Sequence, residues 1–275
     1  MPGKTVIVVP CYNEALRLDL QVFRRFAAQH RDIRFLMVND GSTDSTSAVL
    51  GELVNSLPGS FEAISLERNS GKAEAVRRGI LHAMASGAEL VGFLDADLAT
   101  PLPEVLSLRD LMNAEHSREV AVGIRMPLLG RRIRRNSLRA WLGRRFAQVA
   151  SWVLGTGISD TQCGAKLFRV NRRTAFAFSE PFLSRWIFDV EILARYLHCS
   201  VQDGVRDGIY EWPLNDWQEV RGSKLRPKDF VAAFGQLATI YLRYFLSQQW
   251  RLKAQSWDWT AVEAPATDVV RRRAA

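Results

Sequence analysis

Two aspartates follow a short apolar run in the sequence VGFLDADL at residues 91–98. The run is typical of a buried strand, and strand side chains alternate between two faces, so Asp95 and Asp97 begin on the same face. Two carboxylates this close repel each other unless a cation lies between them. Hard divalent ions use one or two carboxylates and complete their shell with water and phosphate oxygens. The pair therefore predicts a site for Mg²⁺ or Mn²⁺, with a turn that caps the next helix as the alternative.

Three more polar segments, each after an apolar run, repeat this arrangement. The apolar runs are typical of strands and the stretches between them have helical periodicity, so the first hundred residues predict the order β-α-β-α-β-α-β. This order implies a mostly parallel sheet flanked by helices on both faces. Ligands of such sheets bind beyond the carboxyl ends of the strands. We therefore expect four polar segments to meet at one site: residues 10–14, 39–44, 67–72 and 95–97.

The rest of the chain continues the α/β pattern and then becomes helical. Apolar residues recur at spacings of three and four from Leu138 to Val153, with arginines between them, which predicts an amphipathic helix. A second long helix is expected near the C-terminus, and the last residues are rich in Ala, Pro and charge. We expect a catalytic domain at 1–226 that includes a basic amphipathic helix at 131–154, a C-terminal amphipathic helix at 227–253 and a flexible tail at 254–275.

Composition places the chain among ordinary globular proteins. Its 275 residues are 47% hydrophobic and 24% charged, and its three cysteines match no zinc or disulfide framework, which favours a reducing compartment. No window of about 18 apolar residues predicts a membrane-spanning helix. The N-terminal apolar run is too short for a signal peptide. We expect a cytoplasmic protein, and the sequence carries no signal of its oligomeric state.

The positive charge is concentrated in one segment. Residues 118–145 contain nine arginines and one acid, Glu119, a local excess equal to the net charge of +8 of the whole chain. A balanced remainder argues against a nucleic-acid-coating protein. The basic helix is open to three interpretations: a surface helix packed on the core, a helix on a membrane surface, or a nucleic-acid patch. Each arginine near an anionic bilayer contributes about 1 kcal/mol. This contribution favours a peripheral protein on the inner face of the membrane and no nucleic-acid partner.

The motifs resemble a known family. VPCYNE at 9–14, VNDGSTD at 38–44, NSGK at 69–72 and DAD at 95–97 resemble the successive signatures of the large inverting glycosyltransferase family with the GT-A fold. Three further motifs are similar to the dolichyl-phosphate and polyprenyl-phosphate glucosyltransferases of that family. They are DTQCG at 160–164 with Lys166, WIFDVE at 186–191 and WQEVRGSK at 217–224. The chain departs from the family in having Asn39 before Asp40, where two aspartates are common. It also lacks the membrane helices that follow the catalytic domain in many bacterial relatives.

The resemblance implies a GT-A (Rossmann-like) fold and a nucleotide-sugar donor site. A divalent ion on Asp97 would neutralise the departing diphosphate, and Asp95 would position the ribose and metal-bound water. Asp40 would accept from uracil N3–H, or it is a turn residue. The remaining donor contacts would come from the backbone at Pro10 and Tyr12 around the base, Glu14 at the ribose, Lys72 at the base edge or diphosphate, and Lys224 at the diphosphate. The alternatives for Glu14 and Lys72 are a helix-start charge and a solvated lysine.

On the acceptor side, the resemblance implies a lipid phosphate. The second pKa of such a group lies near 6, so it is a good nucleophile at neutral pH without a strong base. Arg125, Arg139 and Lys166 are the candidates to bind the acceptor phosphate. Asp160 is the candidate base or orienting group, with a turn cap as the alternative. Asp189 and Glu191 point in different directions on a helix, and one of them, most simply Asp189, would line the site.

These inferences predict a metal-dependent inverting transferase. It would move a hexose, most simply glucose from UDP-glucose, to a polyprenyl or dolichyl phosphate. One alternative keeps the donor and takes a soluble hydroxyl acceptor, which would require a true general base. The other is a non-enzymatic basic binding protein, against which the four polar segments at one sheet edge argue.

Overall fold

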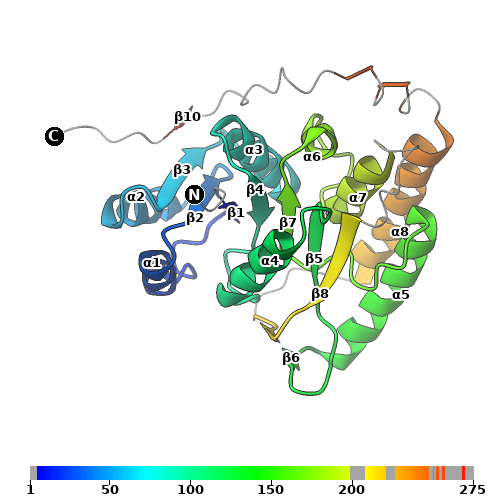
Figure 1. The fold of residues 1–275 in the computed structure, drawn as a ribbon, viewed down its shortest axis with the longest axis horizontal. Coiled ribbons are helices and arrows are strands. Elements are labelled where there is room, and N and C mark those ends of the chain that lie inside the picture. The colour runs from blue at the N-terminus through cyan, green and yellow to red at the C-terminus, as the bar shows by residue number, and fades with distance from the viewer. Residues whose placement is uncertain are drawn as a thin grey trace.

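An eight-stranded sheet forms the centre of the molecule (Figure 1). The computed structural model describes residues 5–198, 208–220, 227–247, 250, 252–253, 256–257 and 268–269. The strand order in the sheet is β10-β3-β2-β1-β4-β7-β5-β8. The strands are β1 (Thr5–Cys11), β2 (Ile33–Asn39), β3 (Phe61–Ser65), β4 (Leu90–Phe93), β5 (Val120–Ile124), β7 (Lys166–Arg169), β8 (Ile209–Pro213) and β10 (Asp268–Val269).

The first four strands are parallel, as their sequence pattern predicted. β1 pairs with β2 on one side, with Thr5 opposite Ile33, and with β4 on the other, with Thr5 opposite Leu90. β7 departs from this pattern because it runs antiparallel between β4 and β5. The predicted mostly parallel α/β sheet is confirmed, and β7 brings the chain back to the middle of the sheet from its second half.

Helices cover both faces of the sheet because β1 alternates its side chains between two cores. Val6 and Val8 belong to one cluster of buried residues, and Ile7 and Val9 to the other. α1 (Leu20–Gln29), α2 (Thr46–Ser56) and α4 (Pro103–Ala114) supply buried residues to the cluster around Ile7. The cluster around Val8 contains residues of α3 (Lys72–Ala85), α5 (Ser137–Leu154), α6 (Arg172–Phe178), α7 (Phe188–His198), α8 (Pro227–Tyr241) and the π-helix η2 (Leu242–Leu246).

The predicted basic helix at 131–154 is shorter than expected. Residues 132–134 form β6 (Arg132–Arg134), which pairs in parallel with β9 (Asp216–Gln218). The arginine-rich stretch therefore begins as a strand. α5 starts only at Ser137, where the side chain of Asn136 accepts from the backbone N–H of Leu138 at 3.1 Å.

The predicted C-terminal helix at 227–253 is also interrupted. α8 ends at Tyr241, and the π-helix η2 follows it directly and ends at Leu246. Most of the predicted flexible tail lies outside the described residues, but Asp268 and Val269 pair with β3 as a short antiparallel strand. Among the described residues, none of the helices is long and apolar enough to cross a membrane.

Gly79 determines how closely α3 approaches the sheet. A Cβ at this position would lie 2.4 Å from Cγ1 of Val8 and 2.9 Å from Cγ2 of Val38. Alanine normally stabilises a helix by about 1 kcal/mol relative to glycine. At Gly79 the clash with two buried branched side chains outweighs this gain because a packed core resists overfilling.

We therefore expect Gly79→Ala to destabilise the protein by about 1–3 kcal/mol in urea denaturation. Gly51→Ala is the matched control, because Gly51 also lies inside a helix and nothing lies within 4 Å of its Cβ position. This variant should be neutral or more stable. Equal effects of the two substitutions would contradict the packing argument.

Candidate active site

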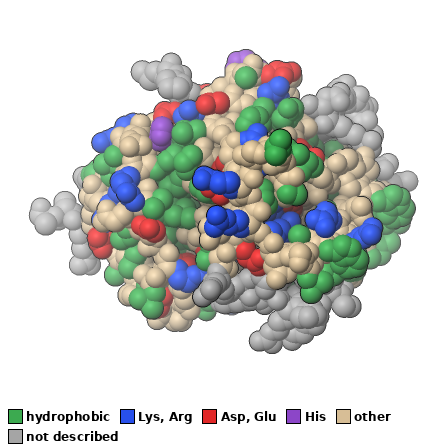
Figure 2. Space-filling model, turned by 90° about the horizontal axis from the view of Figure 1, so that it is seen from below, with side chains coloured by type: hydrophobic (Ala, Val, Ile, Leu, Met, Phe, Trp, Pro, Cys, Tyr) green, Lys and Arg blue, Asp and Glu red, His purple; other side chains and the backbone are tan. Residues whose placement is uncertain are grey.

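A pocket of about 630 Å³ opens beyond the carboxyl ends of β1, β2 and β4. Figure 2 shows one face of the molecule, with Lys and Arg side chains across its middle and acidic side chains beside them. Most of the residues that line the pocket follow the parallel strands or lie at the start of α7, and a few come from α5, α8 and loops of the second half of the chain. Its lining comprises Pro10, Cys11, Tyr12, Glu14, Arg17, Asp40, Asn69, Gly71, Lys72, Asp95, Ala96, Asp97, Phe146, Gln162, Arg185, Trp186, Ile187, Phe188, Asp189, Val220 and Ala233.

Asp95 and Asp97 lie in the pocket directly after β4. Asp97 accepts from the backbone N–H of Ala99 at 3.1 Å, and its other oxygen lies 3.8 Å from Nη2 of Arg17. Burial and then the nearby charge of Asp95 raise the pKa of the Asp97 carboxyl. The charge of Asp95 therefore disfavours the charged form of Asp97, and the charges of Lys72 and Arg17 offset only part of this effect.

This pair fits a hard divalent cation. Within the described part of the chain, no group of three or more His, Cys, Asp and Glu side chains gathers to hold a metal. A closed all-protein metal site is therefore not present there. One or two carboxylates on an open pocket are the donor set from which Mg²⁺ or Mn²⁺ binds together with substrate phosphates. Asp95 and Asp97 are the side chains that would hold such an ion.

Lys72 brings a positive charge to the carboxylate pair. It is the first residue of α3, and its Nζ forms an ion pair with Oδ1 of Asp95. Burial alone would lower the pKa of Lys72, but the carboxylates of Asp95, Asp189 and Asp97 together raise it. The ammonium is therefore kept in its charged form at the N-terminus of α3.

Asp40 lines the pocket and is buried. Its two carboxylate oxygens accept from the backbone N–H groups of Ser70 and Gly71, each at 2.8 Å. This contact needs Gly41, whose φ is +62° and whose Cβ position would lie 2.4 Å from the backbone of Arg68. Burial raises the pKa of Asp40 despite these two hydrogen bonds. Asp40 therefore holds the 69–71 loop in place while still lining the pocket.

The loop after β1 is braced against the loop after β2. The Oδ1 of Asn13 accepts from the backbone N–H of Thr43 at 2.9 Å, and the backbone N–H of Glu14 donates to Oγ1 of Thr46 at 2.9 Å. Asp44 accepts from the backbone N–H of Ala15 at 3.3 Å. These contacts place Tyr12 and Glu14 at the pocket wall.

One wall of the pocket is formed by the segment before α7 and the start of that helix. Arg185, Trp186 and Phe188 line the pocket there, and Nε of Arg185 lies 3.5 Å from the Cβ position of Gly71. The charge of Arg185 acts on Asp40 by lowering its pKa, against the larger effect of burial. A guanidinium thus lies in the pocket wall near Gly71 and Asp40.

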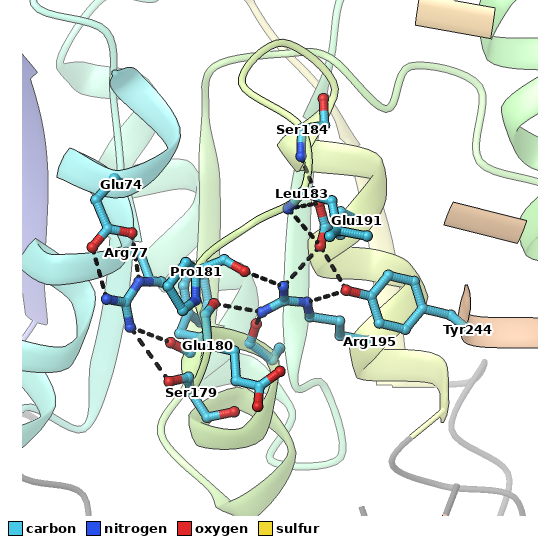
Figure 3. A network of polar contacts seen from close by, with 12 residues as sticks. Glu74, Arg77, Ser179, Glu180, Pro181, Leu183, Ser184, Glu191, Arg195 and Tyr244 are labelled. Atoms are coloured by element: carbon cyan, nitrogen blue, oxygen red, sulfur yellow. Dashed lines mark hydrogen bonds and ion pairs between the residues drawn. The ribbon is translucent and has the colours of Figure 1, made fainter. Parts of the chain in front are cut away.

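Buried polar contacts with α7 and η2 hold residues 180–184, which lead into this wall (Figure 3). Arg195 donates to the carbonyl oxygens of Glu180 at 2.7 Å and Pro181 at 2.8 Å, and forms an ion pair with Glu191 at 2.7 Å. Tyr244 of η2 donates to Glu191 at 2.6 Å and accepts from Arg195 at 3.0 Å. The backbone N–H groups of Leu183 and Ser184 donate to Glu191. Glu191, one of the two acids considered on α7, is therefore a support of the wall and does not line the pocket.

Arg125 and Asp160 lie outside the pocket lining and bind each other. The guanidinium donates to both carboxylate oxygens at 2.7 Å, and the backbone N–H of Arg125 adds a third bond at 3.1 Å. Burial raises the pKa of Asp160, but the Arg125 charge and hydrogen bonds outweigh it and lower the pKa below its ordinary value. The guanidinium carbon of Arg125 lies 5.1 Å from the centroid of the Trp217 ring.

Lys166 also binds a protein carboxylate. Its Nζ lies 2.5 Å from Oδ1 of Asp189 and donates to the carbonyl oxygen of Cys163 at 2.7 Å. The lysine side chain is fully buried, and Asp189 is the member of the pair that lines the pocket. The structure therefore does not bring Lys166 to the pocket surface.

The structure thus brings together the predicted donor-side residues that it describes. Arg125, Asp160 and Lys166 are not brought to the pocket, and Lys224 and the side chain of Arg139 lie outside the described residues. Sequence reasoning missed Arg17, Gln162 and Arg185. Gln162 lies within a motif already singled out, Arg185 directly precedes another, and Arg17 follows Glu14 by three residues.

Comparisons with known proteins agree with this geometry. A family model described as "Glycosyl transferase family 2" matches residues 6–172. The mouse protein named dolichyl-phosphate beta-glucosyltransferase is 35% identical over 262 residues, which cover 90% of this chain and 77% of the mouse protein. The protein of the same name from Saccharomyces cerevisiae is 31% identical, over 87% of this chain and 75% of the yeast protein.

Solved structures share the fold. Glucosyl-3-phosphoglycerate synthase from Mycobacterium tuberculosis, in complex with Mn²⁺, UDP and glucosyl-3-phosphoglycerate, superposes with a TM-score of 0.61 at 18% identity. The match covers 87% of this chain and 79% of that chain. Mannosyl-3-phosphoglycerate synthase from Rubrobacter xylanophilus has a TM-score of 0.64 at 17% identity, over 88% and 74% of the two chains. The predicted GT-A fold is confirmed.

The Arg125–Asp160 pair should contribute to stability in a pH-dependent way. The pKa of Asp160 is lowered by folding, so the contribution is complete above the unfolded pKa of about 3.9 and is lost as the pH falls through the folded pKa. We expect Asp160→Asn to lower the free energy of unfolding by about 3 kcal/mol at pH 7. The difference from the parent protein should shrink below pH 4, as measured by urea denaturation across the pH range.

Glu52→Gln is the control, because Glu52 is exposed and pairs with Arg24 at the surface. This change should cost less than about 1 kcal/mol. If Asp160→Asn abolished catalysis while leaving stability unchanged, Asp160 would act in the reaction and not in the fold.

Proposed function

The chain belongs to glycosyl transferase family 2, and we propose that it transfers glucose from UDP-glucose to a polyprenyl or dolichyl phosphate. Family membership makes it a nucleotide-sugar-dependent transferase. The observation that carries the donor half of the proposal is the convergence of Asp40, Lys72, Asp95 and Asp97 in one pocket. The acceptor half rests on relatives named dolichyl-phosphate beta-glucosyltransferase that align over 90% of the chain.

The donor would lie along the ends of β1, β2 and β4. We assign Asp40 to the base, because its buried carboxylate lines the pocket beside the loop before α3. We assign Glu14, which also lines the pocket, to the ribose. Lys72 and the N-terminus of α3 favour a diphosphate, because a helix start carries partial positive charge and a lysine ammonium binds phosphate oxygens.

A divalent ion belongs to this proposal. Asp97 and Asp95 are the residues that would hold it, and Mn²⁺ is present in the M. tuberculosis fold neighbour. When bound, the ion would neutralise charge on the departing diphosphate. Arg17 and Lys72, which contact the two carboxylates, would limit the repulsion between them whether or not the ion is bound.

The reaction would be a single displacement with inversion. An oxygen of the acceptor phosphate attacks the anomeric carbon of glucose, and the bond from that carbon to the UDP oxygen breaks with its electron pair. The products are UDP and the lipid phosphate sugar. A phosphate dianion carries no proton that must be removed, so Asp160 is not needed as a base. Arg185 and Arg17 line the pocket and are the cations that we propose hold the two anionic substrates together.

A lipid acceptor requires contact with a membrane, and α5 offers a surface for it. The apolar residues of this helix divide between two faces. Phe146, Ala150 and Val153 are buried in the core, as the core-packing interpretation expected. The exposed face carries Leu138, Trp141, Val149 and Trp152, at spacings of three, eight and three residues, and Trp152 is 78% exposed.

Positive charge borders this exposed stripe. Arg144 and Arg145 are exposed on α5, and the guanidinium of Arg145 lies 5.6 Å from the ring of Trp141. Tryptophan and arginine on one helix face are typical of helices that lie in the interface of an anionic membrane. We propose that α5 binds a membrane surface as a peripheral element, with the exposed stripe inserted and the arginines at the headgroups.

The test of the proposed reaction is transfer from radiolabelled UDP-glucose to a short-chain polyprenyl phosphate with Mg²⁺ or Mn²⁺. Asp97→Ala should lower turnover by about 100-fold or more without changing the thermal unfolding temperature. Removal of the ion by a chelator should have a similar effect. Asp110→Asn, at an exposed carboxylate on α4, is the control. Transfer to simple sugars but not to the lipid phosphate would show that the acceptor is a soluble hydroxyl. Retained activity of Asp97→Ala with metal present would show that Asp97 does not hold a required ion.

The membrane proposal predicts that Trp152→Ser lowers binding to vesicles of phosphatidylglycerol and phosphatidylcholine by about tenfold, because a large apolar surface no longer leaves water. Cosedimentation measures this binding. Leu16→Ser is the matched control, since Leu16 is fully exposed but lies outside α5. Binding should also weaken with added salt because the arginine contribution is screened. Equal binding of both variants would contradict insertion of α5.

A further inference from the structure

Gly164 lies directly against the carboxylate of Asp95. A Cβ at position 164 would lie 2.4 Å from Oδ2, 2.8 Å from Cγ and 3.1 Å from Oδ1 of Asp95. Real Cβ atoms are almost never found within 3.0 Å of another heavy atom. The carboxylate therefore occupies the space that any other residue at 164 would fill with its own side chain.

The backbone conformation of Gly164 does not explain a glycine here. Gly41, Gly71 and Gly155 have positive φ angles, which favour glycine, but Gly164 does not. An alanine at 164 would suffer no left-handed backbone strain. Glycine is required here for steric reasons, because the Asp95 carboxylate occupies the position of a Cβ.

The segment that carries Gly164 is held at both ends, so it does not yield to a clash. Asp160 is bound by Arg125 through two bonds of 2.7 Å, and the carbonyl oxygen of Cys163 accepts from Lys166 at 2.7 Å. The carbonyl oxygen of Ala165 accepts from the backbone N–H of Gly123 at 2.9 Å. Cys163 and Ala165 are fully buried. Asp95, in contrast, is a side chain on an open pocket and is the partner that would move.

We propose that Gly164 is a positioning residue: its bare α-carbon sets the orientation of the Asp95 carboxylate toward Lys72 and toward a divalent ion with its nucleotide. The segment 160–166 would then serve the donor site as a rigid wall. The part of this inference that concerns the ion and nucleotide rests on the proposed function. The steric coupling between positions 164 and 95 does not.

The coupling is tested by a double-mutant cycle in thermal stability. Gly164→Ala should lower Tm by about 1–3 °C in the parent protein, because the displaced Asp95 carboxylate loses its ion pair with Lys72. In the Asp95→Ala background the same change should have little effect, because the carboxylate that it meets is gone. Gly157→Ala is the matched control, since Gly157 has no positive φ and nothing lies within 4 Å of its Cβ position.

The double variant keeps the test decisive if Gly164→Ala alone does not fold. Recovery of a folded protein on adding Asp95→Ala supports the proposal. Equal losses of stability in both backgrounds, or failure of the double variant to fold while Asp95→Ala folds, overturn it.

Calorimetric titration with UDP, with and without Mn²⁺, tests the role in binding. Gly164→Ala should weaken Mn²⁺-dependent UDP binding by roughly 10- to 100-fold, as loss of a residue that orients a metal ligand does. Gly157→Ala should bind like the parent protein. Unchanged binding by a folded Gly164→Ala variant overturns the positioning role. Absence of UDP binding by the parent protein would instead overturn the proposed function, while the stability cycle would still decide the coupling.

Discussion

The carboxylates of Asp95 and Asp97 repel each other across one intervening residue, and partial burial strengthens that repulsion because the surroundings screen it less than water does. Burial first, and then the charge of Asp95, cause a rise in the pKa of Asp97. Lys72 at the start of α3 and Arg17 after β1 offset part of it, and each is delivered by a different strand-to-helix connection. The pocket is therefore a balance of charges whose positions are set by the sheet. Such a site suits an anionic ligand that binds together with a cation, because the cation would neutralise the carboxylate charge that Lys72 and Arg17 leave uncompensated.

A second group of charges surrounds this pocket and has a different task. Arg125 with Asp160, Lys166 with Asp189, and Arg195 with Glu191 are pairs whose members bind each other in buried or nearly buried places. Removing water from both partners largely cancels their attraction, so such pairs contribute little net stability, but breaking one of them is costly. They act as geometric constraints. Arg125 with Asp160 joins the residue after β5 to the 160–166 segment, and Lys166 with Asp189 joins β7 to α7. The Arg195–Glu191 pair holds residues 180–184 against α7.

The sequence predicted that the donor-side candidates would lie in one place, because strand order and loop position are linked. Asp40, Lys72, Asp95 and Asp97 each follow a parallel strand or begin the next helix, so their meeting point follows from topology. The second half of the chain carries no such rule. The sequence does not show that β7 enters antiparallel beside β4, and this strand turns Lys166 inward to Asp189. The pairing of Arg125 with Asp160 joins residues 35 positions apart, and either could equally have faced a ligand. On α5, apolar residues occupy both a buried and an exposed face. Their periodicity in the sequence predicted a single apolar face and did not separate the two. Charged residues that bind each other and charged residues that bind substrates look alike until the fold places them.

The π-helix at 242–246 has a consequence for how this protein tolerates changes in length. A π-turn accommodates one more residue than an α-turn, and such turns often mark a single-residue insertion in a helix. Each residue rotates an α-helix by about 100°. Deleting one residue between Leu242 and Leu246 would restore a regular α-helix, but it would turn Tyr244 away from Glu191 and Arg195 or turn α8 away from α5. The wall that carries Arg185 would lose its support from behind, although no residue of the pocket had changed. In this region the number of residues is as strongly constrained as their identity.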